Sequence, residues 1–168
     1  MFLSSSETPE GVPFSRSRIT LVRLMLPTDV NFAGNVFGGS LLKVLDEIAY
    51  VVGSRHARQN MVTASVDRMD FLAPVHLSDV VHFTGQVTHA GHTSLEVSIH
   101  IEAEDLHGTS RRTVGNAYVT MVAIGPDGRP VPVPPILAET PEERRLLEEG
   151  RRRAEERKAR RPTGGGSP

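Results

Sequence analysis

The sequence contains no cysteine and no tryptophan. Without cysteine the chain cannot form disulfides, thiolate metal sites or a cysteine nucleophile, which fits a reducing cytosol. With two tyrosines and no tryptophan, few side chains could stack on nucleic-acid bases. A net charge of -1 gives no overall attraction to DNA or to anionic lipid. We therefore expect no nucleic-acid partner.

Long hydrophobic stretches and several common catalytic motifs are also missing. No apolar run approaches the roughly 18 residues of a membrane-spanning helix, and the first residues lack the basic and apolar regions of a secretory signal. We therefore expect a cytoplasmic protein without membrane insertion. The glycine-rich motifs of dinucleotide and nucleoside-triphosphate sites are absent, as is the GxSxG motif of serine hydrolases. No helical histidine pair suggests a metal ligand set, so we expect neither a metal nor a cofactor.

A chain of 168 residues has room for one domain with a short appendage. Its start is rich in serine, proline and glutamate, and its end carries a charged segment that Thr140 and Glu143 could open with a capping box. Because this segment has few apolar residues, we expect it to lie in solvent or along an interface. The expected order is a flexible tail over 1–14, a folded domain over 15–135, a charged helix over 136–161 and a disordered tail over 162–168.

Apolar periodicity predicts strands around one long helix. From Ser40 to about Ala57 apolar residues recur with helical spacing. Alternation typical of strands occupies the segment before this helix, up to Pro27, and the chain after it to about residue 124. Since a lone helix with an apolar stripe has to be covered, we expect an α+β fold with an antiparallel sheet wrapped around it. The clearest strand pattern puts five apolar residues on one face: Leu95, Val97, Ile99, Ile101 and Ala103.

The first strand after the helix is also expected to alternate regularly. Successive side chains of a strand point to opposite faces of the sheet. We therefore expect one face to carry Val62, Ala64 and Val66, and the other to carry Thr63, Ser65 and Asp67.

Asp46 is the residue of the helix that most needs an explanation. Aspartate has poor helix propensity and loses hydration beside apolar neighbours. At about 100° per residue it falls at the edge of the apolar stripe, next to Leu42 and Ala49, and not on the open polar face. It is either a boundary carboxylate bonded to a neighbouring group, or a base or nucleophile in a partly apolar cleft. The adjacent Glu47 faces solvent and receives no role.

Phe37, Gly38 and Gly39 open the helix. Glycines at this position allow close backbone approach, and the free N–H groups of a helix start can hold an oxyanion, although a tight turn alone would also explain them. Asn35 offers an amide that could orient water or a carbonyl, but asparagine is also an ordinary turn residue. Gly39 and Asp46 lie about 10 Å apart along a helix, so one carbonyl cannot touch both in one chain. A site that uses both predicts an oligomer.

The segment LPTDVNFAGNVFGGSLLKVLDEIA resembles the signature of hot-dog acyl-CoA thioesterases, in particular the cytosolic, brain-type hydrolases and their small bacterial relatives. The likeness continues through RHARQNMVTASVDRMDFLAPV, GHTS, GRPVPVP and EERRLLEEGRRR, and covers roughly residues 16–160. It implies a long helix wrapped by an antiparallel sheet, dimers with a continuous sheet and, often, trimers of dimers. It also implies hydrolysis of acyl-CoA to a free acid and CoA without a metal, with CoA as part of substrate and product.

The resemblance further implies roles for particular residues. The catalytic aspartate of the family falls on Asp46 and its loop asparagine on Asn35, while Gly38 and Gly39 provide backbone donors. Because one chain carries both functional residues, a homodimer should contain two complete sites. The residues expected to border the substrate groove are Phe37, Val66, Asp67, Arg68, Phe71, Gly91, His92, Thr93 and Ser94.

The chemistry implied by the resemblance leaves alternatives open. Asp46 of one subunit would activate water or attack the thioester directly, and the sequence does not choose between them. A hot-dog hydratase or dehydratase would instead use an acid–histidine pair, and His56 lies on the same helix as Asp46. A non-catalytic acyl-CoA sensor would need no Asp46 but usually an effector segment, and no helix-turn-helix is evident.

Overall fold

The computed structural model describes residues 10–160, which contain a five-stranded antiparallel sheet, a small two-stranded sheet and two long helices. The large sheet has the strand order β2-β4-β5-β6-β3. Its strands are β2 (Ile19–Leu24), β3 (Asn60–Phe71), β4 (Val80–Ala90), β5 (Ser94–Glu104) and β6 (Arg111–Ile124). The helices are α1 (Gly38–Ala57) and α2 (Pro141–Arg160), joined to the rest by short segments that include the 3-10 turns η1 (Phe14–Ser17) and η2 (Pro27–Asp29).

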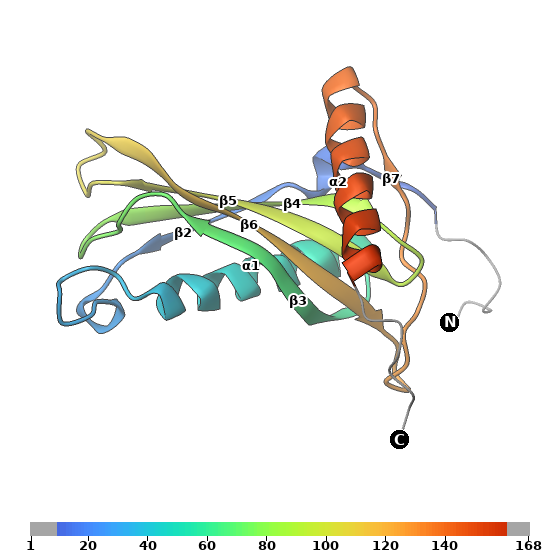
Figure 1. The fold of residues 1–168 in the computed structure, drawn as a ribbon, viewed down its shortest axis with the longest axis horizontal. Helices are drawn as coiled ribbons and strands as arrows, with labels where there is room; N and C mark the ends of the chain where they lie inside the picture. The colour runs from blue at the N-terminus through green and yellow to red at the C-terminus, as the bar shows by residue number, and fades with distance from the viewer. Residues whose placement is uncertain (1–9, 161–168) are drawn as a thin grey trace.

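The helix α1 runs along one face of the sheet (Figure 1). Its apolar stripe, including Val44, Leu45, Ile48 and Val52, is fully buried against the sheet. The close packing uses Gly85 of β4, where a Cβ atom would lie 2.9 Å from the Val52 side chain. The five alternating residues of β5 are all buried in this core. The α+β hot-dog architecture expected from the sequence is therefore confirmed.

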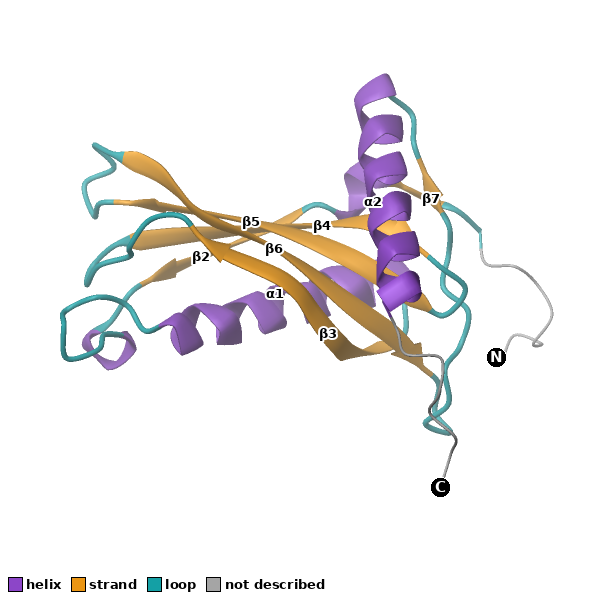
Figure 2. Ribbon diagram, viewed as in Figure 1, coloured by secondary structure: helices purple, strands orange, loops and turns teal. Residues whose placement is uncertain are grey.

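The second helix, α2, lies on the opposite face of the sheet, near one end (Figure 2). The predicted capping box is present, since Thr140 Oγ1 accepts from the Glu143 N–H at 3.1 Å and Glu143 accepts from the Thr140 N–H at 3.1 Å. The helix does not lie free in solvent, because Gly150 and Ala154 are buried. The expected range of 136–161 was too wide at its start, where Ile136–Leu137 forms the strand β7.

The folded part of the chain begins before residue 15. The short strand β1 (Val12–Pro13) pairs in parallel with β7, and Phe14 is only 3% exposed. The N-terminal tail expected over 1–14 is therefore structured from about residue 12, whereas residues 1–9 lie outside the described range, as does the tail expected over 162–168.

The strand β3 lies at the edge of the sheet and does not alternate regularly. Its pairing with β6 shifts between Thr63 and Ser65 and again between Val66 and Arg68. The extra residues at these two bulges are Ala64 and Asp67, which have no partner on β6. The expectation that Thr63 and Ser65 share one face is wrong for this reason.

Within residues 10–160, no helix is long and apolar enough to cross a membrane. The same part of the chain contains no group of three or more histidine, aspartate or glutamate residues arranged to hold a metal ion.

Candidate active site

Asp46 lies on the exposed side of α1 that adjoins the edge strand β3. Thr63 of β3 donates its hydroxyl hydrogen to Asp46 Oδ1 at 2.6 Å. This short hydrogen bond fixes one carboxylate oxygen, while the other accepts no hydrogen bond from any side chain within residues 10–160. From its position at the edge of the apolar stripe, Asp46 was expected to be partly shielded from water. In the single chain it is exposed, because β3 covers only one side of α1.

Exposed apolar side chains lie on α1 and β3, the two elements that carry Asp46 and Thr63. Leu42 and Tyr50 of α1 are 39% and 45% exposed, and Val62 and Val66 of β3 are each 44% exposed. Large apolar side chains gathered at a sheet edge are typical of a surface that another protein covers. A second copy packed here would remove water from around the carboxylate.

The start of α1 is a glycine pair between two phenylalanine rings. A Cβ on Gly38 would lie 3.6 Å from the ring of Phe71, and a Cβ on Gly39 would lie 3.3 Å from the ring of Phe37. Both rings are more than half exposed. Since the first N–H groups of a helix have no partner within the helix, the backbone here can donate to an incoming carbonyl oxygen.

The loop before α1 is organised by an asparagine that the sequence analysis did not single out. Asn31 Oδ1 accepts from the N–H groups of Ala33 at 2.9 Å and Asn35 at 3.2 Å. The Asn31 N–H in turn donates to the Asn35 carbonyl at 2.8 Å, and Gly34 between them has a φ of +81°. The amide group of Asn31 therefore keeps its two N–H donors for other partners, whereas the backbone of Asn35 closes the loop.

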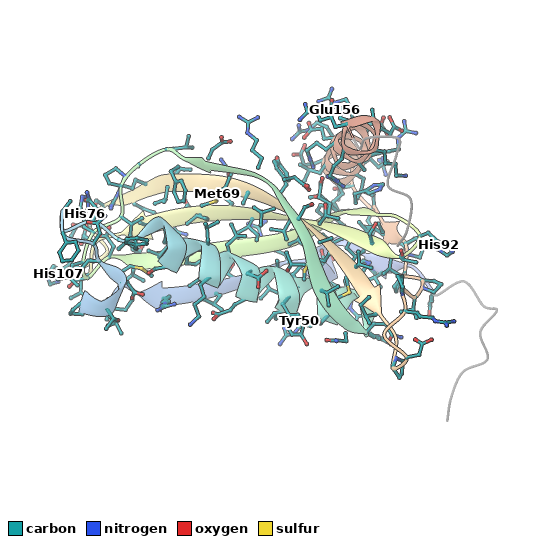
Figure 3. The ribbon with its side chains drawn as sticks, turned by 60° about the horizontal axis from the view of Figure 1, so that its bottom comes forward. Tyr50, Met69, His76, His92, His107 and Glu156 are labelled. Atoms are coloured by element: carbon teal, nitrogen blue, oxygen red, sulfur yellow. The ribbon has the colours of Figure 1, made fainter. Side chains whose placement is uncertain are left out.

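The predicted groove residues do not form one site within a single chain. Phe37, Phe71 and Asn35 lie at the end of the molecule that also carries His76, which pairs with Asn35. The turn 91–94 lies at the opposite end, as His92 and His76 show in Figure 3. That turn is tied to neighbouring segments, because the carbonyls of Thr93 and His92 accept from the N–H groups of Ala123 and Val133, each at 2.9 Å.

The side chains in the middle of β3 point to both faces of the sheet. Arg68 is exposed and forms an ion pair with Asp70 at 2.7 Å. Asp67 points away from α1 and bonds Thr120 at 2.7 Å and Arg157 of α2 at 3.1 Å. Of the expected groove residues on this strand, Val66 and Phe71 stay available, whereas the Asp67 carboxylate is occupied by protein groups.

His56 does not belong to the candidate site. It is 2% exposed, and its ring Nε2 lies 3.0 Å from the Pro134 carbonyl oxygen. Burial lowers the pKa of His56, and the hydrogen bond to Pro134 opposes this shift only in part. A histidine held in this way cannot form the acid–base pair that a hydratase would need with Asp46.

Known proteins similar to this chain share most of its length. The model of the thioesterase superfamily matches residues 33–109. The uncharacterized acyl-CoA thioester hydrolase YkhA of Bacillus subtilis is 37% identical over 140 residues, which are 83% of this chain and 81% of that protein. The chain belongs to the thioesterase superfamily. The cytosolic acyl coenzyme A thioester hydrolase of Rattus norvegicus is 34% identical over 91% of the chain, which spans 41% of that longer relative.

Solved structures of the superfamily superpose closely on this chain. An acyl-CoA hydrolase of Staphylococcus aureus, in complex with butyryl-CoA and CoA, has a TM-score of 0.82 at 34% identity. The superposition covers 89% of this chain and 91% of the S. aureus chain. An apo-hexameric acyl-CoA thioesterase has a TM-score of 0.85 at 39% identity, over 90% of this chain and 97% of that one. Structures are also known of three variants of the S. aureus enzyme, in which an asparagine, an aspartate or a threonine is replaced by alanine.

Two residues of this candidate site could not be found from the sequence pattern. Thr63 was assigned only to a strand face, because its hydrogen bond to Asp46 joins two elements whose contact the local alternation of the strand does not reveal. Asn31 stands four residues before Asn35 in a loop where either asparagine suits a turn. A useful indication was its position at the start of the Asn-Phe-Ala-Gly turn, where an asparagine side chain commonly accepts backbone N–H groups.

Proposed function

We propose that this protein hydrolyses acyl-CoA to a free carboxylic acid and CoA, with Asp46 as the catalytic carboxylate. The observation that carries the proposal is the 2.6 Å hydrogen bond from Thr63, which orients an otherwise open aspartate on the face of α1 beside an exposed sheet edge. The names of the relatives support the substrate class, since they are acyl-CoA thioester hydrolases. A carboxylate of this kind can remove a proton from water or attack the thioester carbon itself.

The backbone at the start of α1 supplies the second half of the chemistry. As the thioester carbonyl is attacked, negative charge develops on its oxygen, and the N–H groups of Gly38 or Gly39 can stabilise it. The rings of Phe37 and Phe71 flank this position. An alanine at either glycine would place a methyl group against one of these rings.

The amide that positions the reacting group is better assigned to Asn31 than to Asn35. In the S. aureus hydrolase the aspartate that was replaced lies 15 residues after the replaced asparagine and 17 before the replaced threonine. Asn31, Asp46 and Thr63 have the same two separations, whereas Asn35 stands only 11 residues before Asp46. The free N–H donors of Asn31 suit a carbonyl oxygen or a water molecule, which supports this assignment.

Asp46 of one subunit is proposed to act with the helix start of another. Asp46 lies eight residues after Gly38, about 12 Å along α1, which is too far for one carbonyl to contact both. Two copies joined along their β3 edges would cover the exposed apolar side chains around Asp46 and bring the separated groove residues together. Hexameric structural neighbours support a trimer of such dimers.

The test is to incubate the protein with acyl-CoAs of different chain length and a reagent for free thiols. Release of CoA is expected, and Asp46→Asn should reduce kcat by at least about 100-fold, because it removes the base or nucleophile. The matched control is Glu47→Gln, the adjacent exposed carboxylate, which should keep its activity.

Each other outcome of this experiment would point to a different function. A changed acyl chain without thiol release would identify a hydratase, and neither product would identify a binding protein. Full CoA release by a folded Asp46→Asn oligomer would remove Asp46 from the mechanism.

A further inference from the structure

A buried carboxylate links α2 to the outer face of the sheet. Glu96 of β5 is 0% exposed and accepts from Thr88 at 2.8 Å, from Arg153 at 2.8 Å and from Arg157 at 2.9 Å. A buried carboxylate without partners would be very costly, and the two arginines of α2 supply the compensating charge and hydrogen bonds. Arg153 also stacks on the ring of Tyr118, 4.1 Å from its centre.

Arg157 extends this network to the edge strand. The same guanidinium nitrogen that binds Glu96 lies 3.1 Å from Asp67 Oδ2. Asp67 also accepts from Ser65 at 2.6 Å and from Thr120 at 2.7 Å. The Asp67 side chain thus ties Ser65 on β3, Thr120 on β6 and Arg157 on α2 to one point on the outer face.

The bulge at Ala64 connects the hydrogen bonds of Asp67 on the outer face to Asp46 on the other side of the sheet. In a regular strand Thr63 and Ser65 would point to the same face. Here Thr63 pairs with Met121, which is buried toward α1, whereas Ser65 pairs with Thr120 of the outer network. The extra residue at Ala64 therefore lets Thr63 reach Asp46 while Ser65 bonds to Asp67.

We propose that Asp67, held by Arg157 and Thr120, is a positioning residue that maintains the Ala64 bulge and so directs Thr63 toward Asp46. This inference rests on the proposed function, in which Asp46 is catalytic. Asp67 does not touch the substrate, because its carboxylate is engaged on the face of the sheet away from α1. The charged C-terminal helix then serves the reaction by fixing the geometry of the catalytic carboxylate.

The test measures whether Asp67 acts through Thr63. We expect Asp67→Ala to lower kcat about tenfold with KM changed less than about twofold, because a misplaced catalytic group affects the reaction more than binding. In a Thr63→Ala background the same substitution should cost less than about twofold. Ser65→Ala is a milder variant that should show the same pattern if Asp67→Ala folds poorly. The control Arg145→Met, on the outward face of α2, should keep wild-type kcat.

Crystal structures of the variants separate this inference from the proposed function. In Asp67→Ala we expect Thr63 to leave hydrogen-bonding distance of Asp46, and a retained bond would overturn the proposal. Equal losses of kcat in both backgrounds, or no loss in either, would overturn it as well. If the wild-type protein releases no CoA, the proposed function fails, and the position of Thr63 in the variant structures still decides the role of Asp67.

Discussion

At the scale of single residues, His56 shows how burial limits protonation. Its Nε2 lies 3.0 Å from a carbonyl oxygen, so this nitrogen carries the hydrogen and donates it, and the other ring nitrogen, Nδ1, is buried without a partner in the described part of the chain. Protonation would place a second N–H in a site that offers no acceptor. The lowered pKa of His56 follows mainly from this burial.

The pH dependence of stability should report this histidine. The unfolded chain binds a proton at His56 near its ordinary pKa of 6.5, whereas the folded chain resists it. The contribution is fully present above about pH 6.5 and is lost as the pH falls toward the lowered pKa of the folded state. We expect the urea midpoint of the wild-type protein to fall between pH 7 and pH 5, and to fall less in His56→Gln. The exposed-turn variant His107→Gln should retain the wild-type slope.

Asn31 offers a second test at residue scale. Asn31→Asp keeps an oxygen for the N–H groups of Ala33 and Asn35 but removes the amide donors. We expect Asn31→Asp to lower kcat about 10- to 100-fold without loss of folding, and Asn35→Ala to stay within about threefold of wild type. Steady-state CoA release measures both, and a larger loss in Asn35→Ala would return the role to that residue.

At the scale of elements, α2 docks by close backbone approach and not by an apolar stripe. A Cβ on Gly150 would lie 2.2 Å from the Thr88 carbonyl oxygen and 3.2 Å from the His89 side chain. The helix therefore needs a glycine in its middle, although glycine disfavours helix formation there.

Gly150→Ala should separate these two effects. In an exposed helix this substitution would stabilise the protein by about 1 kcal/mol, but here the methyl group overlaps the backbone of β4. We expect a loss of stability of at least about 2 kcal/mol in urea unfolding, since α2 has to move away from the sheet. Glu156→Ala, on the exposed surface of the same helix, is expected to change stability by less than about 0.5 kcal/mol. A stabilised Gly150→Ala would show that α2 is only loosely docked.

The secondary-structure elements differ in how much of their position and packing could be predicted from the sequence. The period-2 pattern of β5 and the apolar stripe of α1 predicted both correctly, because each buries a continuous face. The docking of α2 was not predictable from its own composition. This helix docks through ion pairs with the buried Glu96 of β5 and through the close approach of its Gly150 to the backbone of β4. The bulges of β3 escaped for a related reason: they are set by pairing with β6 and by Asp67, not by the local alternation of Thr63 and its neighbours.

At the scale of the whole molecule, a single chain does not bring the proposed site residues together. Asp46 and the helix start are separated along α1, and the turn 91–94, marked by His92, lies at the far end from His76, which pairs with Asn35 just before the helix start (Figure 3). Exposed apolar residues, among them Leu42 and Tyr50 of α1 and Val66 of β3, lie on the elements that carry Asp46 and Thr63. The resemblance pointed to an even-numbered oligomer, and the exposed sheet edge is the physical reason to expect one.

Mixing two inactive variants tests whether the site is shared. In a dimer formed from Asp46→Asn and Asn31→Asp subunits, one site combines both substitutions, while the other joins an intact Asp46 to an intact Asn31 loop. Random association gives such mixed dimers half of the time, so co-expressed variants should recover about a quarter of wild-type kcat, whereas Asp46→Asn alone keeps at most about 1% and Asn31→Asp alone about 1 to 10%. If each site were built from one chain, every site would carry one substitution and the mixture would stay as inactive as its components. Light scattering on the same samples checks that both variants keep the wild-type oligomer, so that a failure to recover activity would count against the shared site and not against assembly.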